Sequence, residues 1–79
     1  MLFSSYKGGD CLINNLKKER KAKKIKQCDL ADAIGVSSKI VYNWEKGKSI
    51  PSIRFVLLIS KVLDIPVERL YSIDDEVNS

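Results

Sequence analysis

The pattern of apolar and polar residues predicts two short amphipathic helices, one over residues 27–34 and one over residues 38–45. In each stretch, three apolar residues fall on one face of a helix: Leu30, Ala31 and Ile34, then Ile40, Val41 and Trp44. An isolated helix of fewer than roughly 12 residues is marginal in water. We therefore expect the two helices to be stable only when they pack against each other and against a third element.

Three residues between these helices, Gly35, Val36 and Ser37, favour a short and sharp turn. Glycine accepts the left-handed backbone conformation that ends many helices, whereas a residue with a Cβ atom loses about 1 kcal/mol or more there. Val36 can fill the corner, and the hydroxyl of Ser37 can accept a hydrogen bond from the free amides at the start of the second helix. The pattern therefore predicts a helix-turn-helix.

Three further helices are predicted around this pair. The first covers about residues 12–22. Residues 53–63 are nearly continuously apolar, which predicts a buried central helix with Ser52 as its cap. The last helix begins at Pro66, because proline is preferred in the first turn of a helix.

The length of 79 residues and the 44% of hydrophobic residues indicate one small globular domain. We expect it to cover residues 12–72, after an N-terminal tail or arm over residues 1–11 and before an acidic tail over residues 73–79. The longest unbroken apolar run, residues 55–59, is far shorter than a membrane span. The expected setting is the cytoplasm, without a membrane partner.

The sequence carries little that favours catalysis. It contains no histidine, which removes the commonest general base, and no serine or cysteine stands in a recognisable nucleophile motif. Cys11 and Cys28 alone cannot complete a structural zinc site with four ligands. We expect no enzyme, no metal, no cofactor and no small-molecule substrate.

Charge is distributed unevenly along the chain. Residues 17–26 contain seven basic residues against Glu19, a net charge of +6, whereas residues 64–79 contain five acidic residues against Arg69, a net charge of −4. A basic surface attracts the DNA phosphate backbone, although a run of charges is often only a solvated helix face.

Several short motifs occur together in one register. They are Gln27, Leu30-Ala31, Gly35-Val36-Ser37, Trp44-Glu45, Gly47-Lys48, Pro51 and the later segment LDIPVERLYS. With them the chain resembles the lambda-type repressor and Cro (XRE-like) helix-turn-helix DNA-binding family over about residues 12–72. The resemblance implies an all-α fold, a compact bundle of five short helices with a central helix-turn-helix.

The second helix of such a motif contacts bases with its N-terminal residues, because that end reaches the floor of the major groove. The candidate base-contacting residues are Ser38, Lys39, Ile40 and Asn43. Lys39 could donate to guanine, and Asn43 could pair with adenine. The alternatives are a phosphate contact for Lys39 and an exposed helix position for Asn43.

Phosphate contacts fix the register of a protein on DNA. The resemblance assigns this role to Gln27 at the start of the second helix. Lys26 departs from the family pattern, which usually has serine, threonine or asparagine there, but it adds a positive charge. The remaining candidates follow the recognition helix: Lys46, Lys48 and Ser49.

Two charged residues are interpreted as structural. The resemblance implies that Arg20 and Glu45 form an ion pair, which ties the first helix to the end of the recognition helix. The stripe that contains Trp44 predicts a core position for its indole rather than a stacking surface.

These features predict a sequence-specific regulator of transcription that binds double-stranded DNA. We expect it to be a repressor that acts as a homodimer on a pseudo-palindromic operator. Ile65, Tyr71 and Ile73 are the expected dimer contact. An anti-repressor is an expected kind of protein partner that could control this repressor. One alternative is an antitoxin or immunity regulator that also binds a protein partner, such as a toxin, through the N-terminal LFSSY. Another is a protein-interaction module without DNA binding.

Overall fold

The computed structural model describes residues 11–74. Within them the chain forms five helices and a two-stranded antiparallel sheet. In chain order the elements are β1 (Cys11–Asn14), α1 (Leu16–Ala22), α2 (Gln27–Ile34), α3 (Ser38–Lys46), α4 (Ile53–Leu63), α5 (Val67–Leu70) and β2 (Tyr71–Asp74). The predicted all-α class with five short helices is confirmed, with a small sheet added to it.

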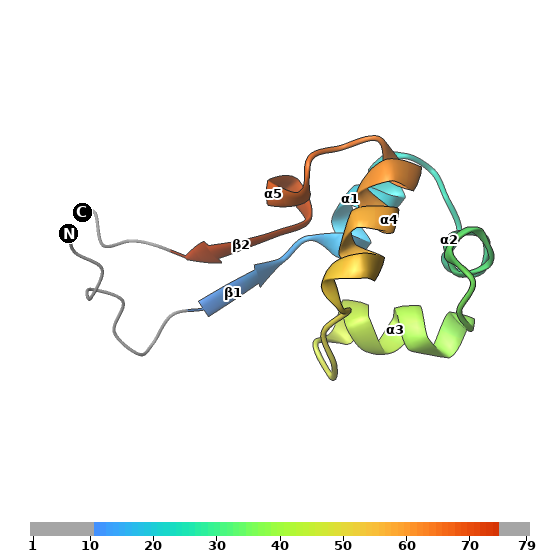
Figure 1. Ribbon diagram of the computed structural model, residues 1–79, viewed down its shortest axis with the longest axis horizontal. Coiled ribbons are helices and arrows are strands. Elements are labelled where there is room, and N and C mark those ends of the chain that lie inside the picture. Colours follow the sequence, from blue (N-terminus) through green and yellow to red (C-terminus); the bar gives the residue numbers. More distant parts are fainter. Residues whose placement is uncertain (1–10, 75–79) are drawn as a thin grey trace.

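The helices gather into one body, from which β1 and β2 extend side by side as a ribbon (Figure 1). Helices α2 and α3 pack against α4 and α1 around a single hydrophobic core. The core side chains are Leu16, Leu30, Ala31, Ile34, Val41, Trp44, Ile59, Leu63, Ile65 and Leu70. Every helix contributes to this set, so that none of these short helices has to be stable alone.

The turn between α2 and α3 has the geometry that its sequence predicts. Gly35 is left-handed, with φ of 81°, and the amide of Val36 donates to the carbonyl of Ala31 at 3.0 Å. Ser37 is the N-cap of α3, and its Oγ accepts from the amide of Ile40 at 3.4 Å. The boundary between the two helices is therefore set by local signals, a glycine at one end and a capping hydroxyl at the other.

The first helix begins later than predicted. Residues 11–14 form β1 instead of a helical turn, and α1 starts at Leu16. Strand β1 pairs antiparallel with β2, with Leu12 opposite Ile73 and Asn14 opposite Tyr71. The pairing joins residues far apart in the sequence, so no local pattern could predict it. The predicted tail segments 1–11 and 73–79 lie mostly outside the described residues, but strand structure covers residue 11 and residues 73–74.

The predicted burial of the central helix is only half right. Val56, Ile59 and Leu63 are buried, but Ile53 and Leu57 lie on an exposed face. Ser52 is the N-cap residue of α4 as expected, but its side chain makes no capping hydrogen bond. The amide of Val56 still donates to the Ser52 carbonyl at 3.0 Å, so the first turn of α4 is closed by backbone alone.

Another correction concerns the end of the domain. Ile65, which we expected in a dimer contact, is buried in the core of the chain itself. Its amide donates to the carbonyl of Ser60 at 3.1 Å, and this hydrogen bond closes the C-terminal end of α4. A side chain committed in this way is not free to contact a partner.

Candidate nucleic-acid interface

One face of α3 presents side chains that the fold does not use. Lys39 and Ile40 are exposed, and Ser38 and Asn43 are partly exposed. The side chains of Lys39 and Asn43 form no hydrogen bond with any other described residue. Their donors are therefore available to a partner. The structure thus brings the four predicted base-contacting residues together on one short helix.

The opposite face of α3 is held firmly. Val41 is fully buried, and Trp44 is 5% exposed, so the predicted core position of the indole is confirmed. The rings of Trp44 and Phe55 pack with centroids 5.5 Å apart, which joins α3 to α4. The helix ends at Gly47, whose φ of 80° is left-handed.

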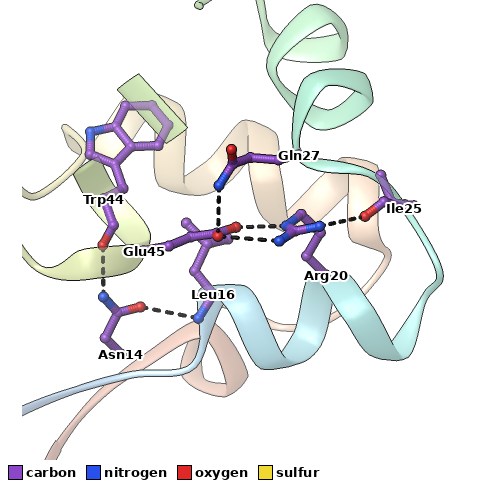
Figure 2. Close-up of polar contacts among 7 residues, drawn as sticks. All are labelled: Asn14, Leu16, Arg20, Ile25, Gln27, Trp44 and Glu45. Carbon is purple, nitrogen blue, oxygen red and sulfur yellow. Dashed lines mark hydrogen bonds and ion pairs between the residues drawn. The ribbon is translucent and has the colours of Figure 1, made fainter. Parts of the chain in front are cut away.

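An ion pair fixes the C-terminal end of α3 to α1. Arg20 Nε lies 2.6 Å from Glu45 Oε2, and Arg20 Nη2 donates to Glu45 Oε1 at 3.2 Å (Figure 2). The guanidinium also donates through Nη1 to the carbonyl of Ile25 at 2.8 Å. Both side chains are almost completely buried. The pair expected from the resemblance is therefore present, with a paired and hydrogen-bonded geometry that a buried charge requires.

Gln27 joins the same cluster. Its Nε2 donates to Glu45 Oε1 at 3.0 Å, so the carboxylate accepts from two different helices (Figure 2). Sequence reasoning assigned the Gln27 side chain to a phosphate contact and did not anticipate this bond. In the described chain the side-chain amide faces inward toward Glu45, and the start of α2 is joined to the end of α3.

Asn14 is a further structural residue that sequence reasoning missed. Its Nδ2 donates to the carbonyl of Trp44 at 2.8 Å, and its Oδ1 accepts from the amide of Leu16 at 3.1 Å (Figure 2). One side chain thus bonds to the first amide of α1 and to a carbonyl near the end of α3. An asparagine just before a helix is a known capping signal, but the bond to Trp44 depends on the tertiary fold.

The candidate phosphate-binding residues lie in two places. Lys26 is exposed immediately before α2, in extended geometry and without a side-chain capping bond. Lys46, Lys48 and Ser49 are exposed at and beyond the end of α3. The ammonium groups of Lys46 and Lys48 each lie 5.7 Å from the centroid of the Tyr42 ring, so the ring attracts both positive charges to one side of α3.

Comparisons with known proteins agree with this architecture. A family model described as Helix-turn-helix matches residues 16–70. An uncharacterized HTH-type transcriptional regulator of Methanocaldococcus jannaschii is 33% identical over 63 residues, which is 80% of this chain and 96% of that protein. This chain belongs to the lambda-type repressor and Cro helix-turn-helix DNA-binding family.

Two further relatives of this helix-turn-helix protein are informative. YqaE of Bacillus subtilis, also an uncharacterized HTH-type transcriptional regulator, is 36% identical over 56 residues, 71% of this chain but 48% of YqaE. This chain therefore spans about half the length of YqaE. The P22 c2 repressor, solved in complex with synthetic operator 9T, matches with a TM-score of 0.64 and 30% identity, over 68% of this chain and 82% of that chain.

One buried group near the ion pair of this helix-turn-helix domain has no hydrogen-bond partner among the described residues. The hydroxyl of Tyr71 is buried and forms no hydrogen bond within residues 11–74. Burial, with a smaller contribution from the negative charge of Glu45, raises the pKa of Tyr71 to about 12. The hydroxyl is therefore neutral at physiological pH and lies within the electrostatic influence of the cluster around Glu45.

Two features are absent from the described residues of this helix-turn-helix protein, a cluster of possible metal ligands and a membrane-spanning helix. Among residues 11–74 no group of three or more His, Cys, Asp or Glu residues could hold a metal ion. None of the helices in that range is both long and apolar enough to cross a membrane. Cys28 is an exposed free thiol.

Proposed function

We propose that this helix-turn-helix protein is a sequence-specific transcriptional repressor that binds double-stranded DNA as a homodimer. The observation that carries the proposal is the division of α3. Its buried face is fixed by Val41, Trp44 and Glu45, while the donors of the exposed Lys39 and the partly exposed Asn43 are unbonded in the described chain. A rigid helix with free donors at its N-terminal end suits contact with base edges in the major groove.

Base and phosphate contacts have separate tasks in the proposal. Ser38, Lys39, Ile40 and Asn43 contact base edges and determine specificity. Phosphate contacts from Lys26, Lys46, Lys48 and Ser49, and from the backbone amide of Gln27, set the register. The side chain of Gln27 is assigned to positioning Glu45, because its amide already donates there. The exposed lysines of α1 add a sequence-independent attraction for DNA.

The homodimer follows from the size of the domain and from symmetry. One module of this size contacts about half of an operator, so two copies are expected on a pseudo-palindrome with half-sites about one helical turn apart. Repression would come from occlusion of a promoter in the cytoplasm. The operator complex of the P22 c2 repressor supports double-stranded DNA as the partner.

The domain boundaries belong to the same proposal. Residues 12–72 form the DNA-binding unit, and residues 1–11 and 73–79 serve as an arm and an acidic tail. The alternative of a toxin bound by the N-terminal LFSSY falls on residues outside the described range, and an anti-repressor that controls the protein stays a prediction. No described residue favours that alternative or the interaction module without DNA.

Selection of bound duplexes from a random DNA pool at physiological salt tests the proposal. A two-fold symmetric motif is the expected result. Affinity for the selected duplex should then fall with salt, with a slope of log Kd against log salt of about 4 to 6 per protomer. Absence of any enriched motif, together with a slope near zero, would reject DNA binding. Lys61→Ala, at the end of α4 farther from α3 (Figure 1), is a charge-matched control for Lys39→Ala.

A further inference from the structure

Tyr42 is an exposed aromatic residue in the recognition helix α3 to which the proposed function gives no role. Its side chain is 42% exposed, and its hydroxyl forms no hydrogen bond with another described residue. The core takes Val41 and Trp44 from this helix, but not Tyr42. The fold of the domain therefore does not explain why an aromatic ring stands at this position.

Two lysines meet at this ring. The Nζ atoms of Lys46 and Lys48 each lie 5.7 Å from the centroid of the Tyr42 ring, so the two ammonium groups are no more than twice that distance apart. A positive charge within about 6 Å of an aromatic centroid is attracted to the negative face of the ring. Tyr42 thus draws two like charges to one place on the surface. We call Tyr42, Lys46 and Lys48 the lysine clamp.

The turn at the end of α3 brings the second lysine to the ring. In a continuous helix, Lys46 would lie one turn after Tyr42 on the same face, but Lys48 would lie about 240° around the helix axis. Gly47 instead has a left-handed φ of 80°, and the amide of Lys48 donates to the Asn43 carbonyl at 2.9 Å. The chain turns back at this glycine, and both lysines therefore reach the same ring.

No carboxylate of the described chain neutralises the lysine clamp. Within residues 11–74, neither of its lysines takes part in an ion pair. Glu45, the single carboxylate on α3, is almost completely buried and is paired with Arg20 (Figure 2). Two neighbouring positive charges repel each other, and an anion close to both offsets the repulsion. The lysine clamp therefore has the charge arrangement that attracts phosphate groups.

We propose that Tyr42 is a positioning residue for DNA binding, whose ring holds Lys46 and Lys48 in place for the phosphate backbone. The inference rests on the proposed function, in which both lysines contact phosphates but nothing orders their side chains. A free lysine has a long flexible stem and loses rotational freedom when its ammonium group is held. Contact with the ring before DNA arrives reduces this loss on binding, and affinity increases accordingly.

The lysine clamp follows directly on the anchored part of α3. The carbonyl of Trp44 accepts a hydrogen bond from Asn14 at 2.8 Å. The next residue, Glu45, accepts hydrogen bonds from Arg20 and Gln27. These bonds fix the backbone that carries the clamp. Phosphates bound by the clamp would thus have a set position relative to the base-contacting residues, which is how phosphate contacts determine register.

The test compares three side chains at position 42 of the full-length protein. Tyr42→Leu removes the ring but keeps an apolar side chain of good helix propensity, whereas Tyr42→Phe removes only the hydroxyl. Because the residue is exposed, both variants should keep the fold, which circular dichroism and urea unfolding check. Tyr42→Leu should weaken binding to the selected duplex about 3- to 10-fold, since two exposed cation–π contacts are lost. Tyr42→Phe keeps the ring face and should restore most of the wild-type affinity.

Two readouts separate the positioning of lysines from a contact of Tyr42 itself with a base. The slope of log Kd against log salt should fall by about 1 in Tyr42→Leu, because lysines that are not held contact phosphates less. The ratios of affinity for duplexes changed one base pair at a time should stay as in the wild type, because phosphate contacts carry no sequence information. Loss of discrimination at one base pair would overturn the inference and make Tyr42 a base-contacting residue.

A double-mutant cycle connects the ring to the two lysines. Lys46→Ala and Lys48→Ala should each weaken DNA binding at least about 2-fold more in the wild type than in Tyr42→Leu, where the ring is already lost. Lys26→Ala is the matched control, because this candidate phosphate contact precedes α2 and lies outside the clamp. It should weaken binding by the same factor in both backgrounds. In the free protein, NMR should show the ε-methylene protons of both clamp lysines shifted upfield by the ring in the wild type and in Tyr42→Phe, but not in Tyr42→Leu.

The outcomes separate this inference from the proposed function. A wild type that binds no duplex would reject the proposed function and the inference together. A wild type that binds DNA, with Tyr42→Leu equal to it or with additive cycles for both lysines, would overturn the inference and leave DNA binding intact. Binding as weak in Tyr42→Phe as in Tyr42→Leu would also overturn it, because the hydroxyl rather than the ring would then be the group that acts.

Discussion

The two halves of the recognition helix α3 differ in what their side chains contact. Toward the C-terminal end, Trp44 packs on Phe55, and Glu45 accepts hydrogen bonds from Arg20 and Gln27. Toward the N-terminal end, Lys39 is exposed and has no hydrogen bond to another described residue. One helix therefore contains a segment that determines its position and a segment that is free to contact a ligand.

Under the proposed function, this difference explains how a domain with a small core holds a contact surface accurately. Base recognition needs donors that are not already bonded within the protein, so the contacting end cannot supply its own anchorage. The anchorage comes instead from a buried charge cluster and from Asn14, which bonds to the Trp44 carbonyl. Substitutions in the two halves should accordingly have separate effects, on unfolding free energy at one end and on base discrimination at the other.

The largest loss of unfolding free energy is expected for Glu45→Ala. This substitution leaves the guanidinium of Arg20, which is almost completely buried, without its counter-charge. Removing one partner of a buried pair costs about 3 to 5 kcal/mol, a large part of the stability of a domain of this size. Urea unfolding followed by tryptophan fluorescence measures the loss, and Glu68→Ala on an exposed position of α5 is the control.

A double variant sharpens this first prediction. Arg20→Met with Glu45→Leu removes both charges and should recover most of the lost stability, because apolar replacements of buried ion pairs are often neutral. A loss below about 1 kcal/mol for Glu45→Ala alone would mean that the cluster does not anchor α3.

A smaller loss of unfolding free energy is expected for Gln27→Ala. Its amide donates to the Glu45 carboxylate at 3.0 Å, and hydrogen bonds to charged groups contribute about 1.5 to 3 kcal/mol. If the side chain is structural, the unfolding free energy should fall by this amount, while the affinity of the folded fraction for DNA changes little. Unchanged stability with a large loss of DNA affinity would instead support the phosphate contact that was predicted for this side chain from the sequence.

On the exposed face of α3, Lys39→Ala and Asn43→Ala should each change the unfolding free energy by no more than about 0.5 kcal/mol, because neither side chain is bonded within the described chain. Each should lose about 1 to 3 kcal/mol of discrimination at particular base pairs. Competition binding with duplexes changed one base pair at a time measures this loss. Uniform weakening across all duplexes would instead assign the residue to a phosphate contact.

The sequence predicted those parts of the structure that depend on neighbouring residues. Gly35 and Ser37 set the turn between α2 and α3, and the apolar spacing around Leu30 and Val41 placed both helices to within a residue. Such signals act within one or two turns of chain, so a single sequence contains them. The ion pair of Arg20 and Glu45 was predicted from the family resemblance alone, since residues 25 positions apart share no local sequence signal.

The parts that were missed depend on contacts between distant segments. Strand β1 exists because it pairs with β2 about 60 residues later, and the apolar Leu12 and Ile13 alone suited a helix equally well. The exposed face of α4 was also missed, because continuous apolar sequence does not reveal which side the other helices leave uncovered. Tyr71 was expected on a partner surface, but its ring packs against the core and its hydroxyl is buried near Glu45.

The smallest effect is expected for Tyr71→Phe, and it is a gain. The hydroxyl is buried without a hydrogen bond in the described structure, so its burial costs free energy that no partner offsets. Removing it while keeping the ring should stabilise the domain by about 1 kcal/mol. The control Tyr42→Phe, at an exposed position, should leave stability unchanged. A loss of stability in Tyr71→Phe would show that the hydroxyl has a bonding partner.

The pH dependence gives the same substitution a second test. The pKa of Tyr71 is raised from 10.0 to about 12 in the folded chain, so above pH 10 the unfolded chain loses this proton more readily than the folded chain. The contribution of this raised pKa to the free energy of unfolding is therefore fully present below pH 10 and is lost as the pH rises to about 12. The stability advantage of Tyr71→Phe over the wild type should thus grow between these two pH values. Urea unfolding at each pH measures it. A constant difference in unfolding free energy would place the hydroxyl in contact with solvent.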